Sequence, residues 1–200
     1  MPHDFSTRSD QELARVAAGG DRAAFEAIVR RYSRPLTDFA ANKTASIQDA
    51  EDIVQETFLR AFLNLNTFNA QYSLKNWLFV IAYRLVVSSY RKKKPQQIDQ
   101  RVVSRLVDEQ STSTPEADWI WQLAEQLGDS AHTVLWLRYK QQMDVSDIAQ
   151  IMNKSAISVR VQLHRARRRL AERIDTLAAN DTTGNWTHRQ GVLFERTNRI

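Results

Sequence analysis

Apolar residues recur at the three-to-four-residue spacing of an amphipathic helix along most of this 200-residue chain. No dipeptide of the Asn-Gly kind separates two alternating apolar runs, so the sequence carries no hairpin signal. The helical pattern breaks over residues 96–116, where Gln, Ser and Thr replace aromatic residues. We therefore predict an all-α fold with two small helical domains, residues 1–95 and 117–178, joined by a flexible linker and followed by a tail (179–200) of unknown role.

Capping residues predict where the helices of the first domain begin and end. The expected helices run from Ser9 or Asp10 to Gly19-Gly20, from Asp21 onward with a kink at Pro35, from Ser46 to Phe62 or Leu65, and over residues 74–93. In the fourth helix, the helical spacing predicts a buried stripe of Trp77, Leu78, Ile81, Ala82, Leu85 and Ser89.

The segment ISVRVQLHRARRRL, residues 157–170, begins like a strand but keeps the apolar spacing of a helix. Its apolar stripe is Val159, Leu163, Ala166 and Leu170. A second amphipathic pattern, Val145, Ile148, Ala149 and Met152, precedes it and ends at Asn153-Lys154-Ser155. Asn153 tolerates a left-handed backbone and Ser155 can cap the following helix, so the segment predicts a helix-turn-helix.

The side of this last helix that faces away from the apolar stripe is basic. It carries Ile157, Val161, His164, Arg165 and Arg168, with Arg160 and Arg167 beside them. Apolar side chains among arginines are unfavourable in water but suit a helix that enters the major groove of DNA. The alternative is a solvated charged surface helix, and the preceding helix and turn favour the DNA-binding interpretation.

Positive charge is concentrated in two segments of a chain whose net charge is only +5. Residues 72–94 carry six Lys or Arg and no acidic residue, and residues 145–178 carry seven against three Asp or Glu. This pattern is typical of a protein that contacts a polyanion at two places.

The chain has no cysteine, which excludes disulfides, thiol catalysis and cysteine-based zinc sites. With neither a signal peptide nor a bilayer-spanning run, we expect a cytoplasmic protein without membrane insertion.

Aromatic residues accompany the first basic segment. They are Phe68, Tyr72, Trp77, Phe79, Tyr83 and Tyr90. Cations that hold the backbone and rings that receive unstacked bases suit single-stranded nucleic acid. The alternative is that these rings form the core, and this interpretation fits Trp77 best because Trp77 lies on the apolar stripe.

Acidic residues lie on one face of the third predicted helix, in the segment QDAEDIVQETF. Asp49, Asp52 and Glu56 share this face with Gln55. Such a face could bind a metal, stabilise the helix N-terminus or dock a basic partner. The four histidines, at positions 3, 132, 164 and 188, are scattered. We therefore favour a docking surface and expect no metal and no cofactor.

Three segments together resemble bacterial RNA polymerase sigma factors of the extracytoplasmic-function (ECF) type, over Gln11 to Leu177. DAEDIVQETFLRAF, residues 49–62, resembles region 2.2, which docks on the polymerase clamp. FNAQYSLKNWLFVIAYRLVVSSYRKK, residues 68–93, resembles regions 2.3 and 2.4, which open the −10 element. DIAQIMNKSAISVRVQLHRARRRL, residues 147–170, resembles region 4.2, which reads the −35 element. The chain departs from the family pattern at Leu127-Gly128, Asn153 and Val161-Gln162.

The resemblance and the residue patterns together give three expected sites. Core polymerase would be bound by Asp49, Asp52, Gln55 and Glu56. The −10 element and its melted strand would be contacted by Asn66, Phe68, Asn69, Tyr72, Asn76, Trp77 and Arg84. The −35 element would be contacted by Ser155, Ser158, Arg160, Gln162, His164, Arg165 and Arg168.

The expected function is that of a non-enzymatic initiation factor that binds core RNA polymerase and directs it to promoters. The implied partners are the clamp helices of the largest polymerase subunit, the flap of the second, promoter DNA and an anti-sigma factor. One alternative is a duplex-binding helix-turn-helix regulator whose N-terminal domain senses a signal or dimerises. Another is a metal-dependent hydrolase built on Asp49, Asp52 and Glu56.

Overall fold

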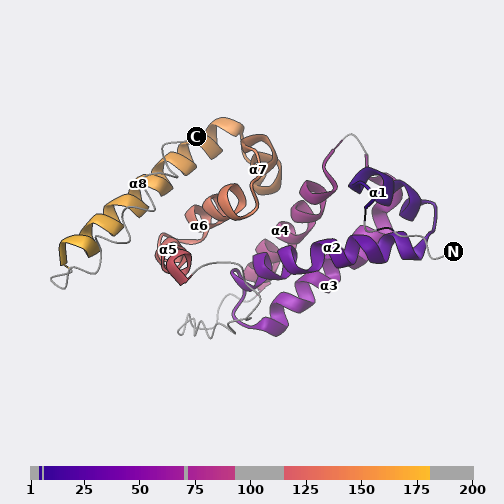
Figure 1. The fold of residues 1–200 in the computed structure, drawn as a ribbon, viewed down its shortest axis with the longest axis horizontal. Helices are drawn as coiled ribbons and strands as arrows, with labels where there is room; N and C mark the ends of the chain where they lie inside the picture. Colours follow the sequence, from indigo (N-terminus) through magenta and orange to yellow (C-terminus); the bar gives the residue numbers. More distant parts are fainter. Residues whose placement is uncertain (1–4, 6, 70–71, 93–114, 181–200) are drawn as a thin grey trace. The chain divides into compact units, whose positions relative to one another are not determined.

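The computed structural model describes residue 5 and residues 7–69, 72–92 and 115–180, which form helices and contain no strand (Figure 1). The all-α prediction is confirmed. The elements are α1 (Asp10–Ala18), α2 (Arg22–Ala41), α3 (Ile47–Asn64), the 3-10 turn η1 (Leu65–Thr67), α4 (Leu74–Lys92), α5 (Pro115–Glu125), α6 (Asp129–Leu135), the π-helical turn η2 (Trp136–Lys140), α7 (Val145–Met152) and α8 (Ala156–Asn180).

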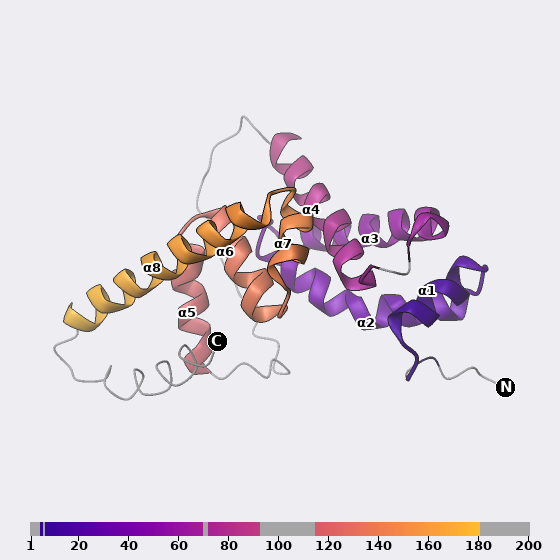
Figure 2. The same cartoon turned by 90° about the horizontal axis from the view of Figure 1, so that it is seen from above.

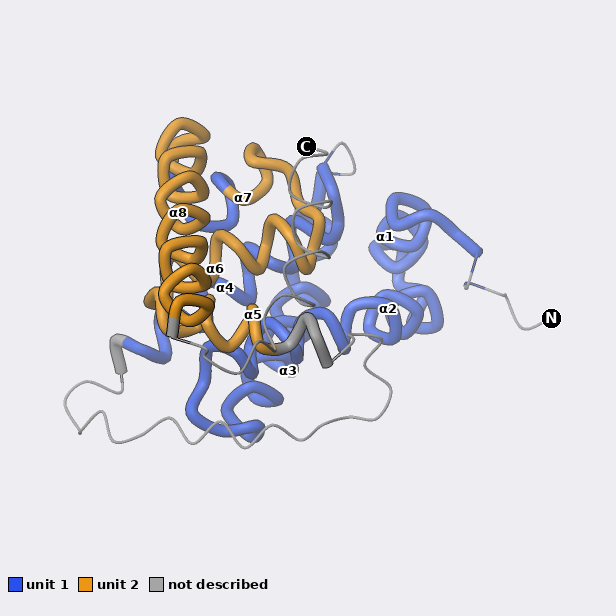
Figure 3. The backbone as a smooth tube through the Cα atoms, turned by 60° about the vertical axis from the view of Figure 1, so that its left-hand side comes forward, with its two compact units in different colours: residues 1–104, 149–154 blue, residues 105–148, 155–200 orange. Residues whose placement is uncertain are grey.

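The chain divides into two compact units (Figure 3). The first comprises residues 1–104 with 149–154, and the second comprises residues 105–148 with 155–200. The predicted linker, 96–116, lies outside the described residues except for its last two positions, which begin α5. The predicted tail likewise lies outside them after residue 180. No described helix is both long enough and apolar enough to cross a membrane.

In the first unit, capping side chains fix the helix starts that the sequence predicts. The N–H of Glu12 donates to Ser9 Oγ at 3.3 Å, and the Ser9 N–H donates back to the Glu12 carboxylate at 2.9 Å. Asp21 Oδ1 accepts from the N–H of Ala24 at 3.1 Å at the start of α2. Between the two helices, Gly20 adopts a φ of +96°, which ends α1.

Asp10 joins α1 to α2 through a network of polar contacts. Its carboxylate pairs with Arg31 at 2.6 Å and accepts a hydrogen bond from the Tyr32 hydroxyl. Arg31 also donates to the carbonyl of Arg8 at 2.9 Å. Burial and the bond to Asp10 raise the pKa of Tyr32 above its usual value, so this hydroxyl stays protonated. The network complements the packing of α1 on α2, which lie side by side in Figures 1 and 2.

The core of the first unit is centred on Phe39 and Phe79, both fully buried, with ring centroids 5.5 Å apart and planes at 63°. This corrects the predicted stripe of α4. The buried α4 side chains are Leu74, Asn76, Leu78, Phe79, Ala82 and Val86, whereas Trp77, Ile81 and Leu85 are partly exposed. Because both α2 and α3 pack against α4, its buried face is wider and centred differently from the single stripe that periodicity predicts.

In the second unit, α6 packs against α8, and α5 contacts both helices. Val134 and Leu137 are fully buried, as is Val159 of α8. The buried ring of His132 stands edge-on to Trp121, with centroids 6.2 Å apart. Hydrophobic burial therefore forms a core of its own in this unit.

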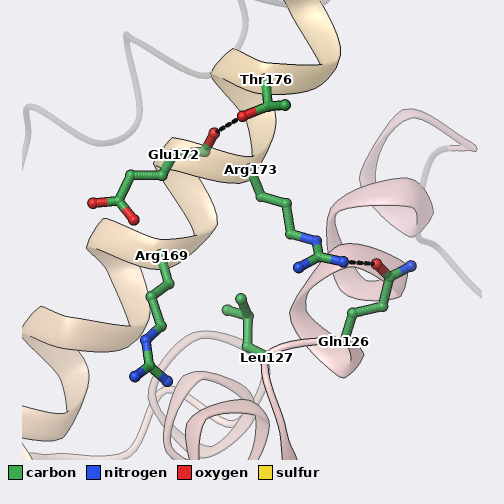
Figure 4. A pocket seen from close by; sticks show the side chains of 6 residues that line it. All are labelled: Gln126, Leu127, Arg169, Glu172, Arg173 and Thr176. Atoms are coloured by element: carbon green, nitrogen blue, oxygen red, sulfur yellow. Dashed lines mark hydrogen bonds between the residues drawn. The ribbon is translucent and has the colours of Figure 1, made fainter.

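A hydrogen bond also connects the C-terminal half of α8 to the end of α5. Arg173 reaches across a shallow pocket and donates to Gln126 Oε1 at 2.7 Å (Figure 4). Within α8, the hydroxyl of Thr176 donates to the carbonyl of Glu172 at 2.7 Å. The pocket is lined mostly by polar and charged side chains, so it offers little apolar surface for a small ligand.

Candidate nucleic-acid and polymerase interfaces

The acidic face of α3 lies opposite its buried face. Ser46 caps the helix by accepting the Asp49 N–H at 3.1 Å. The buried side consists of Ala50, Ile53, Val54, Thr57, Phe58 and Ala61. Asp52 and Gln55 are exposed, while Glu56 is half-buried and pairs with Arg60 at 2.7 Å. Of the predicted acidic residues, Asp52 is therefore exposed on the outer side of the helix, whereas Asp49 and Glu56 are half-buried.

Two leucines that the sequence reasoning missed extend this face. Leu59 is 53% exposed and Leu63 is 67% exposed. With Asp52 and Glu56 they follow the spacing i, i+4, i+7, i+11, which places all four side chains on one side of the helix. We call these four residues the α3 docking face. Exposed leucines beside carboxylates suit a partner that buries apolar surface and contributes cations.

The residues predicted to contact the −10 element fall into three groups. Asn66, Asn69, Tyr72 and Arg84 are exposed, and Tyr72 is 57% exposed. Phe68 and Trp77 are half-buried and pack together, with ring centroids 5.2 Å apart. Asn76 is buried, and its N–H donates to Ser73 Oγ at 3.2 Å. The exposed group presents amides, one ring and one cation to solvent.

Two further aromatic residues of the basic segment are less accessible than predicted. Phe79 has no exposed surface and belongs to the core described above, so it cannot receive a base in this fold. Tyr83 is half-buried, and burial raises the pKa of its hydroxyl.

The turn between α7 and α8 has the geometry that the sequence predicts. Asn153 adopts a φ of +51°, in the left-handed region. The N–H of Lys154 donates to the carbonyl of Ala149 at 2.9 Å, which closes the turn. Ser155 Oγ then accepts the N–H of Ser158 at 3.1 Å and caps α8. The connection is therefore short and defined by local hydrogen bonds.

The two sides of α8 also follow the prediction. Val159, Leu163 and Ala166 are buried, and Leu170 is half-buried. The exposed side carries the predicted residues Ser155, Arg160, His164, Arg165 and Arg168 together with Ile157, Val161 and Arg167. Ser158 and Gln162 lie at the margin, partly buried.

Gln162 is held at this margin by two hydroxyl groups. Ser130 of α6 donates to Gln162 Oε1 at 3.1 Å, and Gln162 Nε2 lies 3.4 Å from Ser158 Oγ. Arg168 pairs with Glu172 one turn further along α8 at 3.2 Å. Gln162 is therefore constrained by side chains of both α6 and α8.

The described part of the chain contains no group of three or more His, Asp or Glu side chains placed to hold a metal ion. Asp49, Asp52 and Glu56 therefore do not form such a group in that part of the chain.

Comparison with known proteins decides between the alternatives that the sequence leaves open. The sigma-70 region 2 family matches residues 28–96, and the sigma-70 region 4 family matches residues 117–170. Together the two matches span more than half of the chain. The chain belongs to the sigma-70 family. In this sigma factor, the region 2 match contains the α3 docking face and the predicted −10 residues, and the region 4 match contains α7, the turn and the predicted −35 residues.

Several relatives of this sigma factor are named as ECF sigma factors, as the sequence predicts. The ECF sigma factor SigW of Bacillus subtilis is 28% identical over 173 residues, covering 79% of this chain and 92% of SigW. The sigma-H factor of Pseudomonas aeruginosa is 25% identical over 188 residues, covering 86% and 97% of the two chains. This ECF sigma factor is thus a transcription initiation factor that directs RNA polymerase to promoters.

Solved structures share its fold. CnrH in complex with the cytosolic domain of CnrY has a TM-score of 0.64 at 24% identity, covering 84% of this chain and 97% of that chain. The sigma factor RpoE of Bartonella quintana, in complex with the anti-sigma factor NepR, has a TM-score of 0.63 at 22% identity, covering 78% and 98%. The two-part helical architecture is therefore shared with sigma factors.

Proposed function

We propose that the α3 docking face, with Asp49 and Gln55 beside it, binds the clamp helices of core RNA polymerase. The single observation that carries this assignment is the exposure of Leu59 and Leu63 next to Asp52 and Glu56. A solvated helix face gains nothing from two exposed leucines, whereas a partner that covers them gains hydrophobic free energy. The carboxylates provide orientation and steer the approach of a basic surface.

Two other surfaces contact promoter DNA in this proposal. The melted −10 strand is received by the exposed residues Asn66, Asn69, Tyr72 and Arg84. The packed rings of Phe68 and Trp77 support these residues. The exposed side of α8 enters the major groove at the −35 element. Asn76 is buried, so its contact with DNA requires that its side chain become uncovered.

Core polymerase raises the affinity of the two DNA-binding surfaces for promoter DNA above what either surface has alone. Each is small, and attachment to one large partner converts the second DNA contact into an intramolecular event with a high effective concentration. This sigma factor would therefore bind promoters tightly only as part of the holoenzyme. Catalysis of RNA synthesis belongs to the polymerase, and the sigma factor itself is not an enzyme.

This sigma factor also has further proposed partners and a proposed location in the cell. Two structures with the same fold were solved as complexes, CnrH with the cytosolic domain of CnrY and the sigma factor RpoE with the anti-sigma factor NepR. We accordingly include an anti-sigma factor among the partners, together with the flap of the second polymerase subunit. The cytoplasm, where polymerase and promoter DNA meet, is the proposed location.

Permanganate oxidation of unpaired thymines tests the proposed function. We expect thymines near the transcription start to become reactive only when promoter DNA, core polymerase and the chain are all present. Tyr72→Ala should reduce that reactivity at least about fivefold, since a stacked base contributes roughly 1–3 kcal/mol. Tyr139→Ala, which removes an exposed ring from the second unit, is the matched control and should leave reactivity unchanged.

A duplex-binding regulator would give a different result in this assay. It would protect double-stranded DNA without core polymerase and leave every thymine paired. That outcome would replace the initiation-factor proposal.

A further inference from the structure

The exposed side of α8 carries two apolar side chains in the middle of a basic surface. Ile157 is 71% exposed and Val161 is 42% exposed. They are four residues apart, so they lie next to each other along one row of the helix, and Arg165 continues that row. Arg160 and His164 form the adjacent row, and both are exposed. The apolar pair is thus bordered by groups that attract phosphate.

The position of Ile157 and Val161 within α8 determines which part of the DNA they can contact. Ser155 caps α8, so Ile157 lies in the first turn and Val161 in the second. In helix-turn-helix proteins, the N-terminal residues of the second helix face base edges rather than phosphates. Long cationic side chains on either side can reach the backbone while the short branched side chains meet the groove floor.

The major groove presents one apolar group, the 5-methyl group of thymine. A branched aliphatic side chain can neither donate nor accept a hydrogen bond, so it cannot discriminate base edges in any other way. Gln162, the nearest amide, is already bonded to Ser130 and lies close to Ser158. The apolar pair therefore has one matching group in the major groove, the 5-methyl group of thymine.

We infer that Ile157 and Val161 read the methyl groups of two T·A pairs in the −35 element. Four residues of helix span about 6 Å, which corresponds to about two base-pair steps of duplex DNA. The two thymines should therefore be neighbours or be separated by one pair, on either strand. This inference rests on the proposed role of α8 at the −35 element and adds the base feature that the helix recognises.

Deoxyuridine isolates the methyl group experimentally because it pairs like thymidine and differs only at the 5-methyl position. The preferred −35 sequence is first selected from a randomised library with holoenzyme assembled from the full chain and core polymerase. Each thymine of that sequence is then replaced by uracil, and holoenzyme affinity is measured by competition. We expect two positions at which the replacement weakens binding about fourfold, the effect of one buried methyl group.

Variants assign each methyl group to its side chain. Ile157→Ala and Val161→Ala should each abolish the uracil penalty at one of the two positions and leave the penalty at the other. Both side chains are exposed, so neither substitution opens a cavity. Leu177→Ala, which removes another exposed apolar side chain from α8, is the matched control and should retain both penalties.

Two results would overturn the inference: a selected −35 sequence in which uracil is tolerated at every position, or penalties that persist in the alanine variants. Either result would leave the proposed function intact as long as the holoenzyme still selects a −35 element. Failure to select any −35 element would instead contradict the proposed function itself.

Discussion

Replacing Asp52 with lysine weakens the binding of core polymerase by at least about thirtyfold in our account. Asp52 is exposed and lies on the α3 docking face, with Glu56 one turn away. The charge reversal at Asp52 places a cation against the basic surface proposed for the partner. Like charges brought together at an interface cost several kcal/mol. A fluorescence titration of labelled sigma factor with core polymerase measures the change. Binding of the unmodified chain should also weaken as salt rises, because exposed charges are screened.

Glu51→Lys is the matched control for this substitution. It makes the same change in net charge at an exposed position of the same helix, but it lies to the side of the row formed by Asp52, Glu56 and the two leucines. We expect its effect to stay below about threefold. Equal losses for both variants would show that net charge, and not the α3 docking face, determines affinity.

Phe79→Ala should lower the unfolding free energy of the first unit by about 3–5 kcal/mol, the usual cost of removing a fully buried phenylalanine. The loss includes the edge-to-face contact with Phe39. A loss of this size is a large fraction of the stability of a typical domain. Hydrogen exchange of the α2 and α4 amides measures it in the full chain, because protection in those helices reports opening of this unit.

Phe79→Leu separates a core role from a base-stacking role. Leucine retains most of the apolar volume, so we expect a loss below about 1.5 kcal/mol and promoter opening close to that of the unmodified chain. Leu63→Ala, at an exposed position, should change exchange protection by less than about 0.5 kcal/mol. Loss of promoter opening in a stable Phe79→Leu variant would contradict the core assignment and restore the base-stacking hypothesis.

Local signals predicted much of the fold. The starts of α1, α2 and α3 follow from Ser9, Asp21 and Ser46, because a capping hydrogen bond involves residues only three positions apart. The left-handed turn at Asn153 is likewise a property of one residue and its neighbours. The apolar stripe of α8 was predictable because this helix buries a single narrow side.

Features that depend on neighbouring helices were not predictable from periodicity. Phe79 and Val86 are buried because several helices, chiefly α2 and α3, pack against α4, and one stripe cannot describe a helix covered on more than one side. The bond between Ser130 and Gln162 joins residues that are 32 positions apart. The helical spacing of Leu59 and Leu63 from Asp52 did place them on the same face. A prediction based on the carboxylates alone did not include them.

The most direct test of the central claim compares promoter binding by the purified chain with and without core polymerase. In an electrophoretic mobility assay at low ionic strength, we predict a specific promoter complex only when both proteins are present, with little shift by the chain alone. A chain that does not associate with core polymerase under these conditions, or that binds a specific duplex tightly by itself, would contradict the account.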